Sequence, residues 1–160
     1  MPTPEWFSKK PMINLRGGQL DDKVILCFLK LLCNQTQNIK CAVVDHIHFS
    51  QYLNCSGDTS TIHRHISNTT DLCDSNLVFF PLNLHLHWSL ITADFTQYPN
   101  VTIFHEDPLN NYNHKKSTHF LVIVKRLIIE QWQWRLQNNR ISPSYHHQTY
   151  LNSLTVYRVE

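Results

Sequence analysis

Two short apolar runs near the middle of the chain constrain the fold most strongly. The first, residues 77–80, has the β-branched and aromatic content of a buried strand. Proline cannot donate a hydrogen bond to a neighbouring strand, so we expect Pro81 to end this strand. The second run, residues 87–92, predicts another buried strand that begins with His87 and Trp88. A histidine beside a core tryptophan is by itself most often a structural pair, so its context decides how it is interpreted.

Length and composition predict one globular domain. The chain has 160 residues, of which 42% are hydrophobic and 16% charged, enough for a real core and too apolar for disorder. The net charge is +2 without a basic stripe, and no apolar stretch has membrane-spanning length or the pattern of a signal peptide. We therefore expect an intracellular protein that binds neither nucleic acid nor a membrane.

The cysteines indicate reduced thiols. Their number is odd and they include no Cys-x-x-Cys pair, which argues against a disulfide framework. All of them lie in the first half of the chain: Cys27, Cys33, Cys41, Cys55 and Cys73.

The first part of the chain predicts a helix, a strand and a loop. Residues 20–33 form the expected helix, with Asp21 or Asp22 as its N-cap. Residues 40–49 alternate enough for a strand, although a helix remains an alternative, and residues 50–71 predict a loop with a short helix at 61–66. The apolar stripe of the first helix should be buried, and consists of Val24, Ile25, Phe28, Leu29, Leu31 and Leu32.

The second part predicts a hairpin followed by a long helix. A turn at 97–100 precedes a strand at 101–104, and Asp107 follows that strand. Adjacent antiparallel strands would bring Asp107 beside His87, so we expect their side chains to lie about 2.6 to 3.2 Å apart. Residues 117–136 predict a helix capped by Ser117 or Thr118. Its apolar side consists of Phe120, Leu121, Ile123, Val124, Leu127, Ile128, Trp132 and Trp134.

These motifs resemble a known protease family. Phe-Phe-Pro-Leu-Asn, then His-Trp-Ser-Leu, and an Asp-Pro-Leu that begins at Asp107 are similar to the histidine and aspartate segments of the Ulp/SENP cysteine proteases, which process SUMO and related ubiquitin-like proteins. The resemblance implies an α+β, papain-like cysteine protease fold with a central mixed or antiparallel sheet flanked by helices. Residues 1–18 would be a loosely ordered lead-in and residues 19–160 the protease domain. The implied function is deSUMOylation, by cleavage of a peptide or isopeptide bond after a Gly-Gly tail, in the nucleus and/or the cytoplasm.

The resemblance also implies roles for individual residues. His87 would be the general base, Asp107 the residue that orients it, and Gln148 a donor to the oxyanion. Asp22 and Trp88 would contact the substrate, and no metal or cofactor is implied. Gln19 stands where the family has a tryptophan that walls the channel for the Gly-Gly tail.

The nucleophile of such a protease is missing from its expected position. In the family a Cys-Gly pair follows the glutamine, and here Leu154 and Thr155 stand at those positions. A Cys-His-Asp protease needs a thiolate, so the sequence predicts an inactive chain, and whether it is an enzyme stays open. The domain would also be incomplete at its C-terminus, which should leave an exposed apolar patch on the sheet or the first helix.

Two other classes of function remain open. Three His-x-His pairs, beginning at His46, His63 and His85, would each point two imidazoles to one face of a strand, and zinc favours imidazole ligands. No Cys pair accompanies them, so a metal site is the weaker interpretation. The other alternative is a non-catalytic module that binds a ubiquitin-like protein without cutting it.

Overall fold

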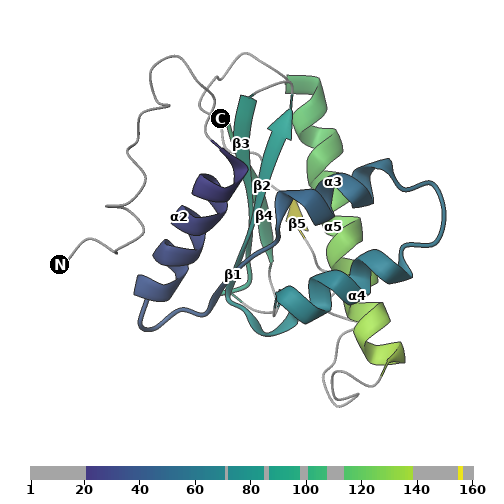
Figure 1. Ribbon diagram of the computed structural model, residues 1–160, viewed down its shortest axis with the longest axis horizontal. Coiled ribbons are helices and arrows are strands. Elements are labelled where there is room, and N and C mark those ends of the chain that lie inside the picture. The colour runs from purple at the N-terminus through teal and green to yellow at the C-terminus, as the bar shows by residue number, and fades with distance from the viewer. Residues whose placement is uncertain are drawn as a thin grey trace.

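A mixed β-sheet with helices on both faces forms the framework of the molecule (Figure 1). The computed structural model describes residues 21–70, 72–84, 87–97, 101–107, 114–138 and 155–156. The strands within these ranges are β1 (Cys41–Val43), β2 (Leu77–Leu84), β3 (His87–Asp94), β4 (Thr102–Glu106) and β5 (Thr155–Val156), in the spatial order β1-β2-β3-β4-β5.

The middle of the sheet is antiparallel and its outer pairs are parallel. β2 and β3 pair with Phe80 opposite Ile91, and β3 and β4 pair with Ile91 opposite His105. β1 runs parallel to β2, and β5 runs parallel to β4. The expected α+β fold with a central mixed sheet is confirmed.

The prediction that Pro81 ends the first strand is wrong. β2 continues through Pro81 to Leu84, with Pro81 opposite Leu90 of β3. The other neighbour of β2 is β1, which pairs only with residues 77–79. The described part of the sheet therefore has no ladder on that side of Pro81, and an edge position of this kind tolerates the missing N–H group.

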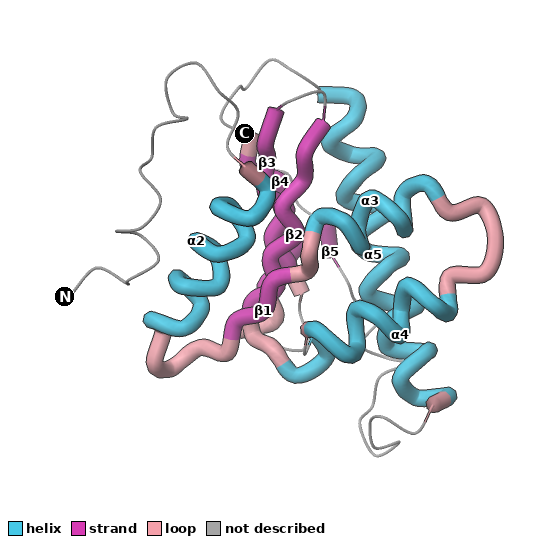
Figure 2. Tube along the Cα trace, viewed as in Figure 1, coloured by secondary structure: helices cyan, strands magenta, loops and turns pink. Residues whose placement is uncertain are grey.

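Helices cover the sheet unequally (Figure 2). α2 (Asp22–Gln35) lies on one face, whereas α3 (His46–Asn54), α4 (Ser60–Thr69) and α5 (His114–Gln137) lie on the other. A short 3₁₀ turn, η2 (Leu72–Asp74), leads into β2. Within the described residues, no helix has both the length and the apolar content that a membrane crossing requires.

The core lies between the sheet and the three helices of its more covered face. Phe49 of α3 packs on Phe80 of β2, with ring centroids 5.9 Å apart, and both side chains are fully buried. The expected apolar side of α5 contributes most of its members to this core, which confirms the periodicity. Its buried residues are Phe120, Leu121, Ile123, Val124, Leu127, Ile128 and Trp132.

The expected burial of the first helix is wrong for most of its stripe. Only Leu29 is buried in α2, while Val24, Phe28 and Leu32 are 45%, 50% and 42% exposed. These three residues follow one another at intervals of four, so they form one row along the helix. The sequence analysis also expected an exposed apolar patch on the sheet or the first helix; this row is exposed, while the incomplete C-terminus from which the patch was argued stays a prediction.

The first half of the chain differs from the sequence-based expectations because helices begin where a strand and a loop were expected. The strand expected at 40–49 stops at Val43, because Asp45 accepts a hydrogen bond from the Ile47 amide at 3.0 Å and caps α3. The loop expected at 50–71 is largely helical, since α3 extends to Asn54 and α4 spans Ser60–Thr69. At the first helix Asp21 is the cap, and it accepts from the Lys23 amide at 2.8 Å.

Two further expectations need correction. α5 begins at His114, so Ser117 and Thr118 lie inside the helix and do not cap it.

The His-x-His pairs at 46 and 63 lie on helices, where a spacing of two does not place both rings on one face. Among the described residues no group of three His, Cys, Asp or Glu side chains could hold a metal ion, and His85 lies outside those residues.

Candidate active site

His87 and Asp107 meet where the middle strands end. Ile91 is opposite His105, and successive side chains alternate between faces, so odd-numbered positions of β3 and the β4 segment share one face. That register places His87 and Asp107 on the same face. His87 Nε2 lies 2.5 Å from Asp107 Oδ1, a short hydrogen bond, with the two side chains 16% and 18% exposed. The two residues therefore lie within hydrogen-bond reach, as their spacing predicts.

A second polar pair lies next to the first on the same face. His105 Nε2 is 2.8 Å from Ser89 Oγ, and His105 is buried. The pairs His87–Asp107 and Ser89–His105 are successive diagonals of one antiparallel ladder. The pairing of β3 with β4 therefore fixes the distance between His87 and Asp107, which we call the dyad.

The carboxylate determines which ring nitrogen of His87 can act as a base. An ionised Asp107 only accepts hydrogen bonds, so it keeps a proton on Nε2. In the neutral ring Nδ1 is then the basic nitrogen, able to take a proton from a nucleophile. This arrangement of base and orienting carboxylate is the one that histidine-dependent acyl transfer uses.

The structure joins the two expected substrate-binding residues through a third residue. Asp22 Oδ2 lies 3.0 Å from His46 Nε2, and the His46 ring meets the Trp88 indole edge to face, with centroids 5.4 Å apart. Of these three residues only Trp88 is next to His87 in sequence, at the start of β3. The sequence analysis missed His46 and treated it only as one half of a His-x-His pair. Asp45 was the available signal, because a capping aspartate predicts a helix there in place of a strand.

Several expected residues lie outside the described part of the chain. Gln148, the expected oxyanion donor, and Leu154, at the expected cysteine position, are among them. Their places relative to His87 therefore remain predictions.

Three of the cysteines, Cys33, Cys41 and Cys55, contact groups other than His87 and Asp107. Cys33 and Cys41 interact with each other, and burial followed by the neighbouring Cys41 raises the pKa of the Cys33 thiol to about 11. Cys55 Sγ lies 3.7 Å from the Asp58 carbonyl oxygen, to which it donates. A thiol with so high a pKa is protonated at neutral pH and is a poor nucleophile.

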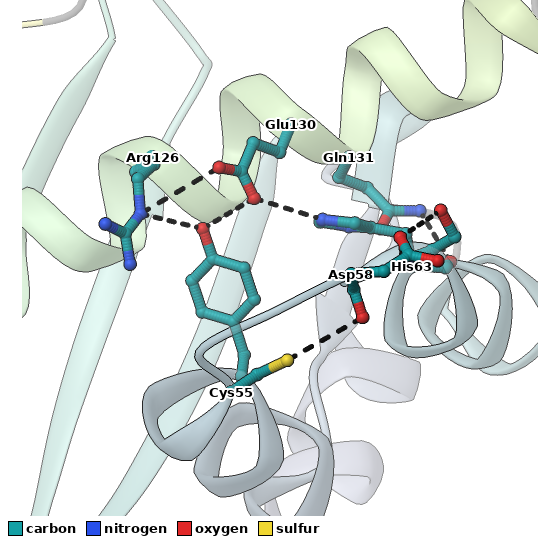
Figure 3. Close-up of polar contacts among 8 residues, drawn as sticks. Cys55, Asp58, His63, Arg126, Glu130 and Gln131 are labelled. Carbon is teal, nitrogen blue, oxygen red and sulfur yellow. Dashed lines mark hydrogen bonds and ion pairs between the residues drawn. The ribbon is translucent and has the colours of Figure 1, made fainter.

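A further histidine–carboxylate pair lies between two helices, with a buried histidine and a partly exposed carboxylate (Figure 3). His63 of α4 is 2% exposed, and its Nε2 lies 3.3 Å from Glu130 Oε2 of α5. Its Nδ1 lies 2.7 Å from Gln131 Oε1, while the Gln131 amide donates to the His63 carbonyl oxygen at 3.2 Å. Both ring nitrogens of His63 are thus bound to side chains of α5.

Tyr52 extends this buried group to α3. Its hydroxyl donates to Glu130 Oε2 at 2.8 Å and accepts from Arg126 Nε at 3.1 Å. Burial, together with Glu130, raises the pKa of the Tyr52 phenol to about 12, although Arg126 acts in the opposite direction. We call Tyr52, His63, Arg126, Glu130 and Gln131 the helix cluster, and its contacts fix three helices to one another.

Comparison with known proteins shows the family and agrees with the fold. Residues 18–156 match the model of the Ulp1 protease family, C-terminal catalytic domain. The structure is similar to a crystal structure of a de-sumoylating protease, with a TM-score of 0.63 and 14% identity, over 91% of this chain and 55% of that one. The Ulp1-like SUMO protease catalytic domain of Chaetomium thermophilum is less similar, with a TM-score of 0.46 and 16% identity, over 71% and 49% of the two chains. No curated protein sequence matches the chain.

Proposed function

The chain belongs to the Ulp1 protease family, and from this premise we propose that its site acts on the Gly-Gly tail of a SUMO-type ubiquitin-like protein. The chain spans 55% of the length of the de-sumoylating protease that it resembles. The observation that carries the proposal is the 2.5 Å contact between His87 and Asp107 at the ends of paired strands. Such a pair supports thiol-dependent cleavage of a peptide or isopeptide bond.

The proposed reaction has a role for each site residue. His87 takes the thiol proton at Nδ1, the thiolate attacks the carbonyl of the last glycine, and the histidine returns the proton to the leaving amine. Asp107 orients His87 and stabilises the imidazolium that forms. Gln148 would donate to the oxyanion, and Asp22 and Trp88 would contact the tail.

The 160-residue chain should not complete this reaction on its own. No cysteine follows Asp107 in its sequence, and Leu154 stands where the family's nucleophile would be. The high pKa of Cys33 makes that thiol a poor substitute. Histidine and aspartate can order a water molecule, but they cannot form the covalent intermediate.

A second candidate function follows from the same missing thiol. A protease-like surface without a nucleophile could hold a ubiquitin-like protein without cutting it. This function needs Asp22 and Trp88 but no cysteine, so the Asp22→Ala and Trp88→Ala variants should lose binding in either case. Binding alone therefore cannot separate the two candidates, whereas covalent labelling can.

The test is a probe that traps thiols. The purified chain and a Leu154→Cys, Thr155→Gly variant are incubated with a SUMO protein whose C-terminus carries a vinyl sulfone, and adducts are detected by mass spectrometry. We expect labelling of the variant only, because its thiol would lie beside His87. A Leu151→Cys variant is the matched control for a cysteine placed in the same stretch but not at the family position.

Two results would contradict the proposal. Labelling of the unmodified chain that disappears in a His87→Ala variant would show that another cysteine is the nucleophile. No labelling of the restored variant, together with no binding of SUMO, would show that the site does not act on this class of protein.

A further inference from the structure

His46 joins three elements at the end of the sheet where the dyad lies. It is the first residue of α3, Asp22 is the first residue of α2, and Trp88 is the second residue of β3. We propose that His46 is a positioning residue that holds Trp88 and Asp22 together as one wall for the diglycine tail, an inference that rests on the proposed function. The reaction assigns no other role to His46.

Both ring nitrogens of His46 face carboxylates. Nε2 lies 3.0 Å from Asp22 Oδ2, and Nδ1 lies 3.3 Å from Asp45 Oδ1. The His46 side chain is 14% exposed and the Asp45 side chain 29%, whereas the Asp22 side chain is 50% exposed, so water competes mainly for the contact with Asp22. A neutral imidazole carries one N–H group, so His46 donates to one of these carboxylates at a time, and both lie within reach of the ring.

The two carboxylates are themselves held in place by helix starts. Asp45 caps α3 by accepting from the Ile47 amide, and Asp22 lies in the first turn of α2, where the helix dipole favours a negative charge. The ring of His46 is therefore attached to two helix N-termini that the fold already positions.

Trp88 contacts the ring of His46. The ring centroids lie 5.4 Å apart with an interplanar angle of 72°, the edge-to-face arrangement that aromatic rings prefer. Trp88 directly follows His87 at the start of β3, and its side chain leaves the strand on the opposite face, so the indole and the base lie on either side of the same strand end. Diglycine has no side chains, so a closely fitting wall would distinguish it from bulkier tails.

The experiment compares binding of two SUMO proteins, one that ends in Gly-Gly and one that lacks these two residues. Isothermal titration measures Kd for the unmodified chain and for the His46→Ala, His46→Phe and His48→Ala variants. His48→Ala is the matched control, because His48 lies on the same helix and stacks on His65.

The four tryptophans are replaced by 5-fluorotryptophan for ¹⁹F NMR of the free protein, and a Trp88→Phe variant assigns the Trp88 resonance.

We expect His46→Ala to weaken binding of the complete SUMO about three- to tenfold, the range of one lost aromatic pair. Binding of the shortened SUMO should not change, because the wall contacts only the tail. The Trp88 resonance should shift in His46→Ala and stay in place in His48→Ala. His46→Phe keeps the ring edge but not the ring nitrogens, so it should restore part of the affinity.

The outcomes separate this inference from the proposed function. In one outcome the unmodified chain binds the complete SUMO and not the shortened one, while His46→Ala binds the complete SUMO equally well. In that case the role of His46 is wrong and the proposed function stands. If no SUMO binds but the Trp88 resonance shifts only in the His46 variants, the contact is supported and the proposed function is wrong. Equal weakening toward both SUMO proteins, with a lower unfolding temperature, would show that His46 only supports the fold.

Discussion

Two of the histidine–carboxylate pairs in the described part of the chain differ in their surroundings. His87 and Asp107 lie at strand ends, 2.5 Å apart, with side chains 16% and 18% exposed. His63 and Glu130 lie between α4 and α5, 3.3 Å apart, and the histidine is 2% exposed and also bound to Gln131. The same chemical pair thus occurs once at strand ends, with both side chains partly exposed, and once between helices, around a buried histidine.

The contacts of the two ring nitrogens are what would distinguish a catalytic histidine from a structural one. A structural histidine uses both nitrogens to join elements of the fold, and His63 does so with two residues of α5. A catalytic base needs a nitrogen that a substrate or nucleophile can approach, and a carboxylate that orients the ring. His87 meets the second condition in the structure through Asp107, and the proposed function assigns the first to its Nδ1.

The largest expected difference between the pairs is in stability. His63→Ala should lower the free energy of unfolding by about 2 to 4 kcal/mol, because it leaves a cavity and removes a partner of the fully buried Gln131. His87→Ala should lower it by less than about 1 kcal/mol, since its side chain lies at the end of the sheet. Urea unfolding followed by circular dichroism measures both values.

A neighbouring histidine provides the control for that comparison. His65 lies on the same helix as His63 but is exposed, so His65→Ala should change the free energy of unfolding by no more than about 0.5 kcal/mol. Equal losses in the His63 and His87 variants would remove the distinction between a structural and a functional pair.

A smaller effect should appear at alkaline pH. The pKa of the Tyr52 phenol is raised from 10.0 to about 12 in the folded protein. Between these values the folded state keeps a proton that the unfolded state releases, so stability is full below pH 10 and falls as the pH rises toward 12. Unfolding free energies at pH 8, 10 and 11 should show the advantage of the unmodified chain over Tyr52→Phe shrinking with pH. A constant difference would mean that the helix cluster does not hold the phenol protonated.

The smallest expected effect concerns the thiols, and it involves no change in stability. With a pKa of about 11, roughly one Cys33 thiol in a thousand is ionised at pH 8. Iodoacetamide should therefore modify the exposed Cys27 well before Cys33, as peptide mass spectrometry would show. Cys41→Ser should speed the modification of Cys33, because it removes one cause of the raised pKa. Cys33 reacting first would make it a candidate nucleophile and weaken the case for an inactive chain.

Much of this fold could be predicted because its signals are local. Hydrophobic periodicity identified α5, and the short apolar runs identified β2 and β3. The extension of β2 through Pro81 could not be predicted, since it depends on how far the neighbouring β1 extends. The exposure of Phe28 could not be predicted either, because the periodicity of a helix does not show which of its apolar residues have a partner.

The site could be predicted only where spacing along the chain determines distance in space. His87 and Asp107 flank a hairpin, so their contact follows from strand pairing. His46 meets Asp22 and Trp88 from elements far apart in sequence, and no local pattern encodes that contact. The helix cluster is long-range in the same way, since it joins Tyr52 to Glu130.

The most direct test of the central claim compares the two pairs in one reaction. Two further variants, His87→Gln and His63→Gln, are made in the Leu154→Cys, Thr155→Gly background, and labelling by the SUMO vinyl sulfone is timed for each. If His87 is the base, His87→Gln should slow labelling by at least about a hundredfold, the usual contribution of a general base. His63→Gln, measured where it remains folded, should label at nearly the rate of its parent. Labelling that is unaffected by the loss of His87, or lost equally without His63, would contradict the assignment of His87 and Asp107 as the functional pair.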